Sequence, residues 1–163
     1  MAKLSIIVIH SPVVLKNVFI KEAFFMEEKY GGPERRMVAR LDQKIPVEYI
    51  FINDNPRREL SEKYSSYIRN FTYSGALLVL DKLNENWIED LTSGITKIDI
   101  DIKIPAYSAP IKAIARVVWL EKKEEPEKSK YLLGLTLTEI TDSDMDRIKN
   151  YMIDFYSGGV KKL

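Results

Sequence analysis

The chain has 163 residues, of which 45% are hydrophobic and 30% are charged, and its formal net charge is +1. This length and composition predict one folded domain with an appendage, not a disordered chain. The near-zero net charge argues against a general nucleic-acid binder, whose affinity comes from many phosphate contacts. Because the sequence contains no cysteine, disulfides, thiolate zinc sites and cysteine nucleophiles are excluded.

Residues 1–32 are expected to form an N-terminal extension made of a short strand over Leu4–Ile9 and a loosely helical segment over Val14–Tyr30. The apolar run after Lys3 is shorter than the core of a signal peptide. No stretch approaches the roughly 18 apolar residues that a transmembrane helix needs. We therefore expect no membrane span and a cytoplasmic location, which the lack of cysteine also fits.

Three arginines follow a Gly31-Gly32-Pro33 joint, at which a helix is expected to stop. They are Arg35, Arg36 and Arg40. A guanidinium is a planar, permanently charged fork that can pair bidentately with a phosphate or with the O6/N7 edge of guanine. Arg36 and Arg40 lie up to about 13 Å apart in an extended chain, or on one face of a helical turn. In either conformation the two can hold a small dianion from different sides.

Six segments have the alternation and composition of β-strands separated by turns, which favours an antiparallel sheet closed, or nearly closed, into a barrel. The clearest is 95–104, in which four isoleucines at alternate positions predict one buried face. In another segment, 111–120, Trp119 is expected on the same face as Val117. The predicted strands are 45–52, 65–71, 76–80, 95–104, 111–120 and 131–138.

The connections between these strands are mostly charged. Asn53–Pro56 is expected to be a turn that opens a charged, solvated loop to about Tyr64, and Glu121–Lys130 a charged hairpin tip. In Asp81–Glu89, Trp87 and Ile88 are expected to close the mouth of the barrel. Asp99 and Asp101 resemble a catalytic carboxylate pair, but their place on the polar side of a strand favours an outer row with cross-strand partners.

A C-terminal helix is predicted after Thr141, the expected N-cap of a capping box that Asp144 completes. It ends at Ser157, and residues 158–163 form a tail. The aspartates near its start mimic a calcium loop, but Arg147 and Ile153 stand where that loop needs glycine and glutamate, so no metal site is expected. The apolar face of the helix is predicted to comprise Met145, Ile148, Met152 and Phe155.

The polar turn Asn70–Gly75 separates two of the predicted strands. Asn70 and Thr72 bring side-chain donors and acceptors, and Gly75 permits a positive φ or a close backbone approach. Turn chemistry alone also explains this pattern, and arginines this close together are usually a solvated face. Each motif is therefore weak by itself. Their order and their places among six strands give them weight.

An Arg-x-x-x-Arg segment before the first barrel strand, followed by Asn-x-Thr-x-x-Gly after the second, resembles the PilZ family of cyclic di-GMP receptors. The resemblance covers residues 33–157 and extends to Ile111–Trp119 and Leu132–Leu137, which look like that family's last two strands. It implies a six-stranded antiparallel split barrel with a C-terminal helix. Thr72 departs from the usual serine or alanine, which bears on affinity. The implied cyclic di-GMP ligands are Arg35, Arg36, Arg40, Asn70, Thr72 and Gly75.

The resemblance implies a ligand receptor that is not an enzyme, needs no metal or other cofactor, and acts on an unidentified downstream protein partner. One alternative is a barrel of the same fold that binds no nucleotide and acts by protein contact, through the extension or the C-terminal helix. Another is a barrel for single-stranded nucleic acid, which the net charge disfavours. Homodimerisation is left open.

Overall fold

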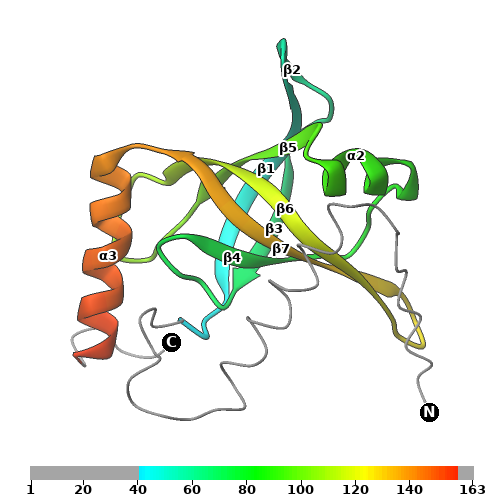
Figure 1. The fold of residues 1–163 in the computed structure, drawn as a ribbon. Helices are drawn as coiled ribbons and strands as arrows, with labels where there is room; N and C mark the ends of the chain where they lie inside the picture. The colour runs from blue at the N-terminus through cyan, green and yellow to red at the C-terminus, as the bar shows by residue number, and fades with distance from the viewer. Residues whose placement is uncertain (1–40, 158–163) are drawn as a thin grey trace.

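A computed structural model describes residues 41–157. The predicted N-terminal extension, the domain boundary at residue 33 and the C-terminal tail lie outside these residues. Seven strands form one sheet in the order β2-β1-β3-β4-β7-β6-β5, and β1 also pairs with β5. That pairing closes six strands into an antiparallel barrel (Figure 1). The strands are β1 Ile45–Asp54, β2 Arg57–Glu59, β3 Tyr64–Arg69, β4 Gly75–Leu80, β5 Thr96–Ile102, β6 Ile111–Glu124 and β7 Ser129–Ile140.

The predicted six-stranded barrel with a C-terminal helix is confirmed, and its core follows the expected alternation. Ile98, Ile100 and Ile102 of β5 are at most 1% exposed, as period-two burial requires. On the outer face, Asp101 lies opposite Lys112 in the register and forms an ion pair with it at 3.1 Å. Asp99 pairs with Arg57 at 3.0 Å. The two aspartates therefore form the expected outer row with cross-strand partners.

Between residues 41 and 157, three helical segments accompany the barrel. A 3-10 turn, η1 (Glu85–Trp87), leads into the short helix α2 (Ile88–Ser93), which contacts β5 and β6. Helix α2 was not predicted, and Gly94 ends it with φ +82°. Helix α3 (Asp142–Tyr156) lies along the barrel at the other side of Figure 1.

The start of α3 forms half of the predicted capping box. The Thr141 hydroxyl accepts a hydrogen bond from the amide of Asp144 at 3.1 Å. The return bond is not formed among the described residues, because the Asp144 carboxylate accepts from Arg147 at 2.7 Å and from the amide of Lys112. Asp144 thus joins the helix to β6 instead of completing the cap.

Three expectations for the strands were wrong. The predicted loop 54–64 contains β2, which pairs with the end of β1 and protrudes from the barrel (Figure 1). Strands β6 and β7 continue to Glu124 and Ser129, well into the expected hairpin tip. The face assigned to Trp119 was also wrong, because a β-bulge between Val117 and Trp119 shifts the register, so Trp119 lies opposite Gly134 while Val117 lies opposite Leu135.

A hydrogen bond between Tyr151 and Gln43 joins α3 to the chain before β1. The Tyr151 hydroxyl donates to Oε1 of Gln43 at 2.8 Å, and the tyrosine is 1% exposed. We expect Tyr151→Phe to lower the free energy of unfolding by about 1 kcal/mol, because one neutral hydrogen bond is lost while the ring stays buried. Urea denaturation measures this, with Tyr73→Phe, at an exposed tyrosine, as the control. Equal stability of both variants would contradict the anchoring role.

Candidate functional site

The turn between β3 and β4 brings Asn70, Thr72 and Gly75 together, as predicted. Asn70 has φ +48°, a left-handed conformation that asparagine tolerates better than most residues. The amide of Thr72 donates to the carbonyl of Gly75 at 2.8 Å and closes the turn. Asn70 is half-buried and no described residue bonds its side-chain amide, so this amide is available to a ligand.

The hydroxyl of Thr72 organises this turn from inside. It accepts hydrogen bonds from the amides of Gly75 at 3.0 Å and Ser74 at 3.2 Å, and it lies 3.2 Å from the Gly75 carbonyl. Thr72 is 5% exposed. Its hydroxyl is thus engaged with the turn backbone, and its added methyl is accommodated without exposure.

Replacement of Thr72 tests how strongly its hydroxyl holds the turn. We expect Thr72→Val to destabilise the protein by about 1–2 kcal/mol, because two backbone amides lose their acceptor while the side-chain volume is kept. Thr72→Ser, which retains the oxygen, is expected to remain within about 1 kcal/mol of the wild type. Thermal unfolding of the two variants gives the comparison. A valine variant as stable as the serine variant would rule out this role for the hydroxyl.

Gly75 is required by close packing and not by a left-handed conformation. A Cβ at this position would lie well under 3.0 Å from the carbonyl oxygen of Leu135 on β7. In the register Gly75 lies opposite Thr136, so the absence of a side chain lets β4 and β7 approach where the turn begins. The predicted close backbone approach is therefore present.

An isolated bridge places the start of the described chain against the same turn. Leu41 and Phe71 exchange both backbone hydrogen bonds, at 2.9 and 3.1 Å, and both side chains are fully buried. Phe71 stands between Asn70 and Thr72. Arg35, Arg36 and Arg40 lie outside the described residues, but Leu41 directly follows Arg40 in the chain.

The outer face next to the turn is shallow and carries Trp119, which sequence reasoning did not connect with the site. A hollow of about 80 Å³ is lined by residues of the turn, by Gly134 and by Trp119. The indole lies across Gly134, where a Cβ would overlap it. The β-bulge that turns Trp119 outward depends on strand pairing, so local alternation predicted the opposite face. Gly134 in the middle of a strand was the available signal, since glycine there often marks a close approach.

Arg116 is a further cation on this face. It lies opposite Thr136, which itself lies opposite Gly75, so two strand spacings of about 4.8 Å separate Arg116 from the turn. No carboxylate among the described residues pairs with it, and its Nε is buried without a hydrogen-bond partner there. Its side chain packs under Gly94 at the end of α2. The sequence analysis did not single out Arg116.

Other chemistry is not indicated by the described part of the chain. No group of three or more His, Cys, Asp or Glu residues there could hold a metal ion, and no helix there is long and apolar enough to cross a membrane. The acidic groups with lowered pKa values lie on the solvated outer face. A hydrogen bond from Lys122 lowers the pKa of Glu85, and one from Lys103 lowers that of Glu48.

The fold defines a small closed antiparallel barrel with a C-terminal helix and a polar turn at one rim. The model of the PilZ domain matches residues 34–154, so the chain belongs to the PilZ domain family. No curated protein matches the sequence.

Solved structures share the fold. The Bacillus subtilis inhibitor of motility, MotI/DgrA, has 21% identity and a TM-score of 0.55, covering 78% of this chain and 54% of its own. The YcgR PilZ domain with c-di-GMP, from Escherichia coli, has 9% identity and a TM-score of 0.52, covering 77% and 95%. The K. pneumonia MrkH–c-di-GMP complex has 15% identity and a TM-score of 0.53, covering 77% and 54%. This chain therefore spans about half the length of MotI and MrkH.

Proposed function

We propose that this protein is a cytoplasmic cyclic di-GMP receptor, not an enzyme, and that it signals to a protein partner. The bridge between Leu41 and Phe71 carries the proposal, because it fixes the residue after Arg40 beside Asn70 and Thr72. Leu41 directly follows Arg40 in the chain, so in this proposal the arginine segment ends within reach of the turn. Family membership and two neighbouring folds in complex with c-di-GMP support the same ligand.

The residues divide the work by chemistry. Arg35, Arg36 and Arg40 pair with the phosphates and with the O6/N7 edge of guanine. Asn70 offers its side-chain amide to a guanine, and Thr72 and Gly75 hold the turn in the shape that presents it. The hollow lined by Gly75, Gly134 and Trp119 receives one edge of a guanine base of the ligand. The ligand needs no metal or other cofactor to bind in this way.

Binding is proposed to order the arginine segment. Three like charges within six residues repel one another, and a dianion between them removes that repulsion. The Gly31-Gly32-Pro33 joint then transmits the new position of the segment to residues 1–32, which a partner protein reads. In this scheme residues 33–157 form the receptor domain, residues 1–32 an output extension and residues 158–163 a tail.

Thermal unfolding separates a receptor from an adaptor that binds no nucleotide. At a cyclic di-GMP concentration of about 100 times the dissociation constant, binding stabilises the folded state by about 2.7 kcal/mol. For a domain of this size we expect the Tm to rise by roughly 5–10 °C. GMP at the same concentration is the control, since it lacks the second phosphate and second guanine. No rise with cyclic di-GMP would favour the adaptor.

A further inference from the structure

An aromatic slot opens at the end of the barrel away from the turn. It has a volume of about 430 Å³, and its lining includes Tyr49, Phe51, Tyr64, Leu80 and Trp87. Gly75 begins β4 beside the turn and Leu80 ends it beside the slot, so the two sites are separated by about 17 Å of strand. The slot is thus distinct from the proposed cyclic di-GMP site.

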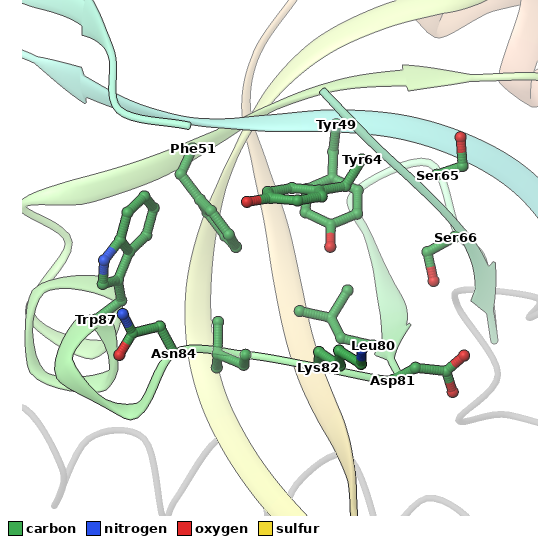
Figure 2. A pocket seen from close by; sticks show the side chains of 11 residues that line it. Tyr49, Phe51, Tyr64, Ser65, Ser66, Leu80, Asp81, Lys82, Asn84 and Trp87 are labelled. Carbon is green, nitrogen blue, oxygen red and sulfur yellow. The ribbon is translucent and has the colours of Figure 1, made fainter. Parts of the chain in front are cut away.

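Four aromatic rings form one wall of the slot. Phe51 and Trp87 pack edge to face with centroids 4.7 Å apart, and Tyr49 and Tyr64 lie tilted at 5.6 Å. Figure 2 shows Tyr49, Phe51 and Tyr64 above, the end of β4 and the residues that follow it below, and Trp87 at the left beside Asn84. Aromatic pairs prefer offset or edge-to-face contacts, so such a wall suits the insertion of a further planar ring.

The hydroxyl of Tyr49 is a polar group at the aromatic wall of the slot. Tyr49 is 5% exposed, its hydroxyl has no hydrogen-bond partner among the described residues, and Figure 2 shows it pointing into the open space. Burial, and then the nearby Tyr64, raise the pKa of Tyr49, so the hydroxyl stays protonated. The hydroxyl is open to the slot, so it can exchange hydrogen bonds with a ligand there.

The entrance is polar and carries a positive charge. Asp81 is paired with Lys128 at 3.1 Å, whereas Lys82 has no ion-pair partner among the described residues. The side-chain oxygen Oδ1 of Asn84 accepts from the backbone amide of Asn86, which leaves the Asn84 side-chain NH₂ to donate to a ligand. A neutral or anionic substituent is therefore favoured at the entrance.

We propose that this slot is a second ligand site, which binds a small planar aromatic molecule with a neutral or anionic polar group. The ring packs against the aromatic wall, a polar atom meets the Tyr49 hydroxyl, and an acidic substituent lies at Lys82. The volume falls within the roughly 300–1,000 Å³ of small-molecule sites, which are likewise apolar with a few placed polar groups. This proposal goes beyond the cyclic di-GMP receptor and does not depend on it.

The test is an NMR titration of the full chain with 4-hydroxybenzoate, followed by ¹H–¹⁵N spectra. We expect saturable shifts at Tyr49, Tyr64 and the Trp87 indole, with a dissociation constant that is roughly millimolar or tighter, as suits so small a ligand. Tyr49→Phe removes only the hydroxyl and Tyr64→Ala removes part of the wall; each is expected to weaken binding by about 3–10-fold. Tyr73→Ala, an exposed tyrosine at the opposite end, is expected to bind as the wild type does.

A matched ligand isolates the aromatic contribution. 4-Hydroxycyclohexanecarboxylate has the same polar groups on a saturated ring and is expected to bind at least about 3-fold more weakly. Three results would overturn the proposal: no saturable shift, saturable shifts centred elsewhere on the barrel, or equal affinity of both ligands. Unchanged affinity in both folded tyrosine variants would overturn it as well. Tyr64 is 38% exposed, so its replacement is compatible with folding, and the same spectra verify the fold.

Discussion

Replacing Arg36 and Arg40 with alanine is expected to weaken cyclic di-GMP binding by at least about 100-fold. A charge-assisted hydrogen bond contributes about 1.5–3 kcal/mol, so the loss of two guanidiniums removes about 3–6 kcal/mol. The barrel should remain as stable as before, because charged arginine side chains rarely belong to a hydrophobic core. Calorimetric titration of Arg36→Ala/Arg40→Ala against the wild type measures the change.

Arg57→Ala/Arg58→Ala is the matched control for that variant. These residues are also close arginines near a turn, but both are exposed on β2, where Arg57 makes a surface ion pair with Asp99. Such pairs contribute about 0–1 kcal/mol to stability. The control removes the same net charge, so it is expected to retain the wild-type affinity. If both double variants lost affinity equally, the net charge of the protein, and not direct contacts of Arg36 and Arg40 with the ligand, would account for binding.

Gly75→Ala is expected to lower the free energy of unfolding by about 1–3 kcal/mol and to weaken cyclic di-GMP binding at the same time. The added Cβ would press on the carbonyl oxygen of Leu135, which belongs to the backbone and cannot rotate away. Strands β4 and β7 must therefore separate where they meet the turn, and Asn70 shifts with them. Chemical denaturation gives the first effect and calorimetry the second.

Ser74→Ala controls for the Gly75 substitution. Ser74 is exposed in the same turn, and the hydrogen bond from its backbone amide to the Thr72 hydroxyl does not depend on its side chain. We expect a change in stability of less than about 0.5 kcal/mol, as for most surface positions. A Gly75→Ala variant with wild-type stability would contradict the close packing described for β4 and β7.

Much of the barrel could be predicted because its strands carry their own pattern. The isoleucines of β5 alternate with charged residues, and period-two alternation leaves one choice of buried face. The C-terminal helix was likewise indicated by its cap residue Thr141 and by apolar spacing. In both cases neighbours in sequence carry the information.

Features that depend on distant partners were missed. Strand β2 has only three residues, and it forms because they pair with the end of β1. Helix α2 has six residues, which are too few to show a clear helical periodicity. The outward face of Trp119 results from a bulge against β7, which alternation within β6 cannot indicate. The Asp144 carboxylate was assigned to the cap, but Arg147 and the β6 backbone bind it instead.

The candidate site shows the same division. The turn residues Asn70, Thr72 and Gly75 were found together because they are close in sequence. Two other features depend on tertiary packing. The Thr72 hydroxyl faces inward, and Leu41 pairs with Phe71, thirty residues away. The hollow beside Trp119 is lined by residues of three strands, so no short sequence motif indicates it.

Isothermal titration calorimetry of the full chain with cyclic di-GMP tests the receptor proposal most directly. We expect a saturable heat with a micromolar or tighter dissociation constant, which requires at least about 8 kcal/mol of binding free energy. That energy is within reach of several charge-assisted bonds to two phosphates and two guanines. A flat titration of folded protein, freed of any co-purified nucleotide, would show that the protein is not a cyclic di-GMP receptor.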